Sequence, residues 1–266
     1  MNALHAFLLA VVQGITEFLP ISSSAHLVLL PIIMDWQDQG LLIDVAAHLG
    51  SLLAVLFYFR SDLGKLLAHV LTPGGSPGEN SEGKNLAWLL LWATVPILIV
   101  ALFAHTYVVQ HSRNAIVIAL ASIFFGLLLW LADWRGSHSR VTRQLTTRDA
   151  LLIGLAQACA LVPGASRAGV TMTAAMWLGL TRVEAARFSF LLAIPTIFAA
   201  SAFSAYQAVL EAATIQWEFG LGVLACSGAV TYLCIHGFIT FVERIGMLPF
   251  VLYRVVLGGV LLFAYW

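Results

Sequence analysis

Charged residues are scarce in this chain. Only 10% of its 266 residues are Asp, Glu, Lys or Arg, and 61% are hydrophobic, whereas a soluble domain has about 25% charged residues. Thirteen basic residues balance thirteen acidic ones, and no block of like charge occurs. The basic footprint of a nucleic-acid-binding protein is therefore absent. The composition excludes an ordinary soluble domain and predicts an integral membrane protein with no nucleic acid as a partner.

Cysteine is also rare, with three residues in the whole chain: Cys159, Cys226 and Cys234. Their odd number and their apolar surroundings exclude a disulfide framework and a Cys-type zinc site, so we expect them to be packing residues. A basic N-terminal region is absent as well, and Gln13 and Glu17 interrupt the first apolar stretch. The N-terminus therefore does not resemble a cleaved signal peptide.

Long apolar runs are what the sequence does have. A helix that crosses a bilayer needs about 20 largely apolar residues, and six segments meet this requirement. They are Gly40–Phe59, Leu86–Ala104, Ala115–Ala132, Phe188–Tyr206, Phe219–Val242 and Leu248–Trp266. The connector TPGGSPGENSEGK, residues 72–84, is flexible by composition.

Two further apolar regions are interrupted near their middle. The first is Ala3–Leu19 followed by His26–Met34, the second is Ala150–Val162 followed by Gly169–Leu180, and a proline follows the first half of each. Unpaired backbone groups cost several kcal/mol in lipid, so such breaks occur only where protein or a wet cavity surrounds them. We therefore expect each region to be a re-entrant pair of half-length helices.

The two breaks resemble one another. VQGITEFLPISS and AQACALVPGAS each run from a glutamine to a serine nine positions later, Gln13 to Ser22 and Gln157 to Ser166. Paired, interrupted segments are typical of inverted-repeat membrane proteins with a midplane site. We expect an all-α membrane domain, 1–266, of six full transmembrane helices and two re-entrant pairs in inverted-topology repeats. Repeat one covers about 1–132 with its pair at 3–34, and repeat two about 150–266 with its pair at 150–180.

The distribution of Lys and Arg predicts the orientation. If both re-entrant pairs return to the side from which they start, ten basic residues fall on one side and only Arg113 on the other. The positive-inside rule assigns the rich side to the cytoplasm. Both termini and the opening of the first pair then face outward. Two basic residues remain within membrane segments, Arg167 and Arg254, and we expect Arg254 to lie near the cytoplasmic end of the last span, outside the site.

The first break carries polar side chains that a structural break alone does not require. Gln13 and Glu17 are four residues apart and share a helix face, and Ser23 and His26 would share a face of the next half-helix. A carboxylate inside a membrane is costly and by default indicates function. For each residue taken singly, an ordinary role in capping, ion pairing or packing remains the alternative.

The second break, PGASRAGVT, supplies positive charge. After its Pro-Gly turn, Ser166 can cap a helix whose N-terminus attracts anions, and Arg167 offers a fork suited to phosphate. One interpretation is an ion pair in which Arg167 merely neutralises Glu17. The alternative is a phosphate site made of Arg167, Ser166, Thr171 and backbone amides. Glu17 and Gln13 would then hold a metal beside it.

Together the breaks closely resemble the two signature motifs of the bacterial undecaprenyl-diphosphate phosphatase family, the bacitracin-resistance type. HLGSLLAV, FSFLLAIP and LPFVLYR extend the resemblance over essentially the whole chain. The matched motif residues are Gln13, Glu17, Pro20, Ser22, Ser23, His26, Pro163, Gly164, Ser166, Arg167 and Thr171. Ala168 departs from the family, whose second motif usually has a serine there, and this puts one hydroxyl contact in doubt.

The resemblance implies hydrolysis of undecaprenyl (polyprenyl) diphosphate to the monophosphate and inorganic phosphate, which recycles the lipid carrier of cell-wall polymers. It implies a location in the bacterial inner membrane, and the orientation predicted above would open the site to the periplasm. Catalysis is expected from Glu17, Ser23, His26 and Arg167. Ser23 is the expected nucleophile and His26 the base, and direct activation of water by His26 is the alternative. Substrate binding is expected from Ser22, Gly164, Ser166, Arg167 and Thr171, and Mg²⁺ or Ca²⁺ at Glu17 and Gln13.

Other interpretations stay open. A lipid-phosphate flippase fits the repeat and the midplane charges, alone or beside the phosphatase, although a carrier needs no Ser and His next to a carboxylate. An ion channel gated by Glu17 and Arg167 fits less well. Asp44 and His48 belong either to an outer layer of the cavity or to the membrane interface. Small residues would allow close packing between the subunits of a homodimer: Gly220, Gly222, Gly228, Gly258 and Gly259.

Overall fold

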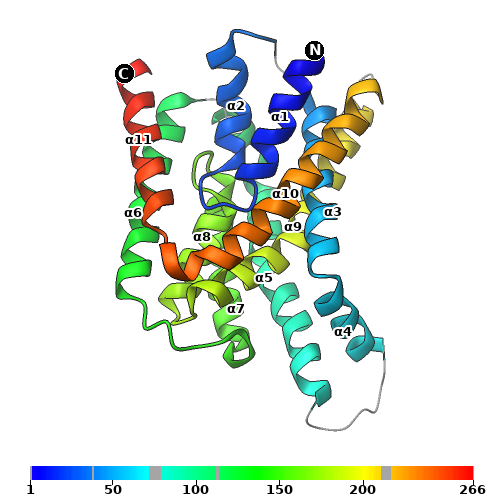
Figure 1. The fold of residues 1–266 in the computed structure, drawn as a ribbon, viewed down its shortest axis with the longest axis vertical. Helices are drawn as coiled ribbons and strands as arrows, with labels where there is room; N and C mark the ends of the chain where they lie inside the picture. Colours follow the sequence, from blue (N-terminus) through cyan, green and yellow to red (C-terminus); the bar gives the residue numbers. More distant parts are fainter. Residues whose placement is uncertain (1, 38, 72–78, 112–113, 211–216, 266) are drawn as a thin grey trace.

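The computed structural model of the chain is all-helical (Figure 1). It describes residues 2–37, 39–71, 79–111, 114–210 and 217–265. Six helices in these ranges are long and apolar enough to cross a membrane, which confirms the six spans expected from the sequence. They lie within α3 (Leu41–Tyr58), α5 (Glu79–His111), α6 (Ala115–Arg135), α9 (Arg182–Leu210), α10 (Trp217–Ile245) and α11 (Leu248–Tyr265).

The connector expected at 72–84 lies partly outside the described residues. Its last part is helical rather than flexible, because α5 already begins at Glu79. Two short elements also escaped the sequence patterns, since neither has a long apolar run. They are α4 (Arg60–Leu71) and η1 (Thr142–Gln144). A third, η2 (Cys159–Leu161), lies within the apolar run expected at Ala150–Val162.

Four short helices make up the two interrupted regions. α1 (Ala3–Thr16) and α2 (Ser23–Met34) precede α3, and α7 (Thr147–Ala158) and α8 (Arg167–Trp177) precede α9. The longest has 14 residues, or about 21 Å at 1.5 Å per residue, which is less than the roughly 30 Å of bilayer hydrocarbon. In Figure 1, α1 and α2 occupy the end of the bundle where both chain termini lie, while α7 lies toward the other end.

The backbone takes the same unusual conformation at both breaks. Ser22, which precedes α2, has φ 74° and ψ 92°, and Ser166, which precedes α8, has φ 69° and ψ 112°. Gln13 and Gln157, nine positions before these serines, are both fully buried. The similarity of the two breaks therefore extends from sequence to conformation.

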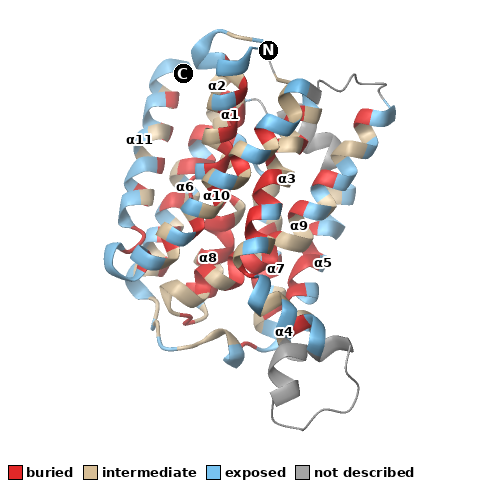
Figure 2. Ribbon diagram, turned by 45° about the vertical axis from the view of Figure 1, so that its right-hand side comes forward, coloured by how far each residue is buried: buried red, intermediate tan, exposed pale blue. Residues whose placement is uncertain are grey.

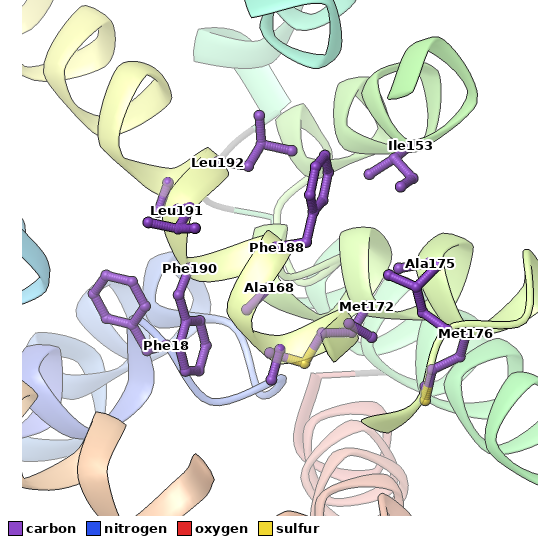
Figure 3. Close-up of a cluster of buried hydrophobic side chains, with 14 of the residues drawn as sticks. Phe18, Ile153, Ala168, Met172, Ala175, Met176, Phe188, Phe190, Leu191 and Leu192 are labelled. Carbon is purple, nitrogen blue, oxygen red and sulfur yellow. The ribbon is translucent and has the colours of Figure 1, made fainter. Parts of the chain in front are cut away.

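Buried residues line the inward faces of the helices, and the outer faces are apolar and exposed (Figure 2). Phe263 and Phe103 are 94% and 87% exposed, as suits side chains that contact lipid. The central core gathers Phe18, Phe188, Phe190 and Met172 around the start of α8 and α9 (Figure 3).

Glycine allows two helix pairs to approach closely within the chain. A Cβ at Gly228 would lie 3.0 Å from the Gly50 carbonyl oxygen, between α10 and α3, and a Cβ at Gly258 would lie 2.8 Å from the Ala119 carbonyl oxygen, between α11 and α6. These two glycines therefore pack inside the chain, in contrast to the homodimer role considered above. Gly220, Gly222 and Gly259 have open space beside them.

The cysteines are free thiols. Cys159 is exposed and the other two are half-buried, so the expectation that all three are packing residues is wrong for Cys159. The reason is that Cys159 follows the last turn of α7 and points away from the core side of that helix.

Candidate active site

Glu17 lies at the centre of the candidate site, where the two breaks meet. It follows the last residue of α1 and is 7% exposed. Its Oε1 accepts a hydrogen bond from Nη2 of Arg167 at 2.9 Å. Its Oε2 accepts from Nε2 of Gln13 at 3.0 Å and from Oγ of Ser23 at 2.7 Å. The shared helix face of Gln13 and Glu17 is thus confirmed, and the contact with Arg167 joins two motifs 150 residues apart.

The Arg167 side chain also contacts α9 and Phe18. Its Nη1 donates to the Ser189 carbonyl oxygen at 3.2 Å, and its guanidinium lies 5.1 Å from the centre of the Phe18 ring. The Thr171 hydroxyl, fully buried one turn further along α8, lies 2.7 Å from the Ser189 hydroxyl. The Thr171 hydroxyl also donates to the carbonyl oxygen of Arg167 at 2.8 Å. Among the described contacts, none joins Thr171 to Glu17.

The turn before α8 explains two further motif residues. The Ser166 hydroxyl accepts from the Gly169 amide at 3.1 Å, which confirms the expected helix cap. Gly164 has φ +91°, and a Cβ there would come within 2.4 Å of the Ile118 carbonyl oxygen, so glycine is required. Ser22, at the equivalent position before α2, makes no such cap; its hydroxyl lies 3.2 Å from that of Ser24.

Ala168 points into the core rather than into the site. It is 1% exposed and lies near Phe188, Phe190 and Met172 (Figure 3). A serine at this position would direct its hydroxyl into the same apolar surroundings. The departure from the family motif therefore changes the core and leaves the Glu17–Arg167 contact intact.

His26 and Ser23 face different partners, although both belong to the first turn of α2. His26 Nδ1 lies 2.7 Å from the Ser22 carbonyl oxygen, and its Nε2 lies 2.5 Å from the Tyr253 hydroxyl. The hydroxyl of Ser23, in contrast, donates to Glu17. Sequence reasoning missed Tyr253, which comes from α11, because a tyrosine in an apolar span carries no local sign of its partner.

Arg254 was expected to lie outside the site, and that expectation is wrong. The side chain is fully buried and reaches both breaks from α11. It donates to four backbone carbonyl oxygens: Pro20 at 3.2 Å, Ser122 at 3.1 Å, and Gly164 and Ala165 at 2.9 Å each. The physical reason is that carbonyl groups at a helix break need donors, and a guanidinium supplies several from one side chain.

His48 also belongs to the site. Its Nε2 lies 3.6 Å from Oε2 of Glu17, and its Nδ1 lies 2.8 Å from the Asp44 carbonyl oxygen. His48 therefore lies beside the carboxylate of the site. The side chain is 30% exposed, compared with 6% for Glu17, so His48 lies on the open side of the carboxylate.

The polar atoms beside Glu17 fit a divalent cation. Gln13 is fully buried, yet its Oε1 has no hydrogen-bond partner among the described residues. Buried polar atoms are nearly always paired, so an orphaned oxygen next to a carboxylate suggests a ligand. Among the described residues no group of three His, Cys, Asp or Glu side chains is placed to hold a metal ion, so the amide oxygen of Gln13 is the additional ligand candidate beside the Glu17 carboxylate.

Sequence comparison with known proteins identifies the family of the chain. Residues 6–260 match the profile of the bacitracin resistance protein BacA. The chain belongs to the BacA family. The undecaprenyl-diphosphatase of Teredinibacter turnerae is 49% identical over 265 residues, which cover 99% of this chain and 100% of that protein. The undecaprenyl-diphosphatase of Saccharophagus degradans is 48% identical and covers 100% of this chain and 99% of its own. These matches confirm that the two motifs of the chain resemble those of the family.

Replacing Arg254 should destabilise the BacA fold. In Arg254→Met, four buried carbonyl oxygens lose a charged donor, and each such hydrogen bond contributes roughly 1.5–3 kcal/mol. We expect a thermal unfolding midpoint in detergent many degrees below that of the wild type. Arg254→Lys keeps the charge but not the fork and should fall between them. The control is Arg244→Met, at an exposed position. Equal midpoints for Arg254→Met and the control would contradict the role assigned to Arg254.

Proposed function

We propose that this protein hydrolyses undecaprenyl diphosphate to undecaprenyl phosphate and inorganic phosphate, and so recycles the lipid carrier of cell-wall polymers. The observation that carries the proposal is the contact between Glu17 and Arg167. In this contact, the carboxylate of Glu17, which also accepts a hydrogen bond from the Ser23 hydroxyl, meets Arg167 at the N-terminus of α8. The names of the full-length relatives support the same reaction.

The second break is the proposed phosphate site. Phosphoryl transfer requires the protein mainly to position groups and to stabilise charge on the phosphate oxygens. Arg167, Ser166 and the first amides of α8 would bind the terminal phosphate, with Gly164 shaping the turn. Ser22 would add its hydroxyl from the first break, and Thr171 would act mainly through Arg167. A phosphate would compete with Glu17 for the guanidinium, so the ion pair is the resting state of the site.

Gln13 and Glu17 would hold a divalent cation, Mg²⁺ or Ca²⁺. When bound, such a cation supplies positive charge that offsets the charge of the diphosphate. The orphaned Oε1 of Gln13 supports this assignment. Gln13 is a neutral ligand, so Glu17 is the carboxylate of the pair.

Ser23 is the proposed nucleophile. Its Oγ attacks the terminal phosphorus, the bridging P–O bond breaks, and undecaprenyl phosphate leaves. Its proton passes to His26, the proposed base, which must turn from Tyr253 to reach Ser23. Water then attacks the phosphoserine, the P–Oγ bond breaks, and His26 returns its proton to Oγ of Ser23. The protons of the water leave with the released inorganic phosphate. Direct activation of water by His26 remains the competing route, and it requires no phosphoserine.

The proposed function predicts metal-dependent release of inorganic phosphate. Purified protein in detergent should release phosphate from undecaprenyl diphosphate, and EDTA should stop the release. Glu17→Gln and Arg167→Gln should each lower the rate by at least about a hundredfold, since each loses a charge at the reacting centre. Glu243→Gln, an exposed glutamate of α10, is the control. Folded wild-type protein that releases no phosphate would refute the proposed function.

A phosphorylated intermediate distinguishes the two routes. Acid quenching of wild-type protein during turnover, with substrate labelled in its terminal phosphate, should trap phosphoserine, which mass spectrometry should locate at Ser23. Ser24→Ala, one residue further along, should still give the label. Ser23→Ala should be inactive and unlabelled. Activity of Ser23→Ala near the wild-type rate would instead establish the water route.

We also propose the finer membrane architecture expected from the sequence. The four half-length helices would form two re-entrant pairs in inverted repeats, with the first pair open to the periplasm and both termini there. The matched backbone of Ser22 and Ser166 supports two repeats. The orientation is supported by the basic residues of α4 and of the connector between α6 and α7, which lie at the end of the bundle away from the termini (Figure 1).

Cysteine labelling tests this orientation. In a background without the three native cysteines, an impermeant maleimide added to intact spheroplasts should label Ser24→Cys, because Ser24 is exposed beside the site. Ser139→Cys, exposed in the connector between α6 and α7, should react only after permeabilisation. The opposite pattern would invert the topology and place the site on the cytoplasmic side.

A further inference from the structure

Two acceptor atoms, Oε2 of Glu17 and Nε2 of His48, face each other, and a third, Oε1 of Gln13, belongs to the amide beside them. Oε2 of Glu17 lies 3.6 Å from Nε2 of His48, too far for a hydrogen bond. Gln13, whose amide nitrogen lies 3.0 Å from the same Oε2, carries the buried Oε1 without a partner in the described ranges. A half-turn of this amide would bring Oε1 to the position of its nitrogen, next to the carboxylate.

The hydrogen bond of Nδ1 of His48 determines which ring nitrogen carries the lone pair. A carbonyl oxygen only accepts hydrogen bonds, so Nδ1 of His48 must carry the proton that it shares with the Asp44 carbonyl oxygen at 2.8 Å. The lone pair of a neutral imidazole is then on Nε2, which is the atom directed at Glu17. Histidine ligands of metals generally donate their other ring N–H to a carbonyl or carboxylate in this way.

We propose that His48 is the third protein ligand of the divalent cation, with Glu17 and Gln13. The inference rests on the proposed function only for the presence of that cation. One carboxylate oxygen, one amide oxygen and one imidazole nitrogen make a mixed set. Mg²⁺ and Ca²⁺ prefer oxygen ligands, whereas transition metals accept imidazole. The site should therefore bind Mn²⁺ more tightly than Ca²⁺, with substrate oxygens completing the coordination.

The negative charge of Glu17 is already balanced by the buried Arg167, whose Nη2 lies 2.9 Å from Oε1. A simple ion pair with protonated His48 is therefore less favoured than a shared cation. Oε2 is the oxygen that remains available to that cation. Ser23 donates to Oε2 as well, and a hydroxyl can turn its oxygen toward a cation. His48 is partly exposed, which leaves a path by which a cation can enter from the open side.

Pulsed electron paramagnetic resonance of bound Mn²⁺ reads out the proposed bond directly. Wild-type protein in detergent, loaded with Mn²⁺ without substrate, should show the ¹⁴N modulation of a coordinated imidazole. His48→Gln should lose this modulation and bind Mn²⁺ about 10- to 100-fold more weakly, while its Ca²⁺ affinity should change far less. His236→Gln, an exposed histidine of α10, should retain both. Gel filtration of each variant confirms that it is folded.

The possible failures are distinguishable. Wild-type protein that binds Mn²⁺ without ¹⁴N modulation, or modulation that persists in His48→Gln, overturns the role of His48 and leaves the proposed phosphatase and its cation untouched. Absence of Mn²⁺ binding in the wild type overturns both the cation and the role of His48. The phosphatase itself would fail separately, in the phosphate-release assay with the same preparations.

Discussion

Polar backbone in the middle of a membrane protein must find its hydrogen bonds inside the protein, and this constraint organises the molecule. Both helix breaks leave carbonyl groups without helical partners. Arg254 donates to Pro20 in the first break and to Gly164 and Ala165 in the second. Because one guanidinium serves both breaks, neither can move away without leaving buried carbonyls unpaired. The distance between Glu17 and Arg167, and with it the site, depends on a residue that touches neither of them in the described contacts.

The same arrangement sets the charge of the site. Arg254 is fully buried and, among the residues that the structure describes, its hydrogen bonds go only to carbonyl oxygens. Glu17 is paired with Arg167, so the two buried guanidinium groups at the breaks exceed the one carboxylate. In a low-dielectric interior, the electrostatic attraction of this excess positive charge for an anion is stronger than in water. The multiply charged diphosphate of the proposed substrate would offset this positive charge together with that of the proposed cation.

Features that depend on local sequence, such as helix length and helix caps, were predictable, whereas contacts between distant segments were not. Apolar length gave the six spans, and helical spacing placed Gln13 beside Glu17. The motif of Ser166 predicted a cap that is present. Contacts between distant segments were not predictable, because Tyr253, Arg254 and His48 lie in apolar spans whose local patterns do not reveal what they meet. The expected pairing of Ser23 with His26 rested on spacing alone, and tertiary contacts direct the two side chains elsewhere.

Ser22 and Ser166 have positive φ angles of 74° and 69°, a region in which a residue with a side chain costs on the order of 1–3 kcal/mol. Glycine would relieve that strain at either position and would also remove a hydroxyl from each break. Selection for heat resistance alone would therefore drift toward glycine at these two positions and erode the site. A search for stabilising substitutions should therefore leave both serines unchanged, and at Ser166 it would also keep the cap of α8.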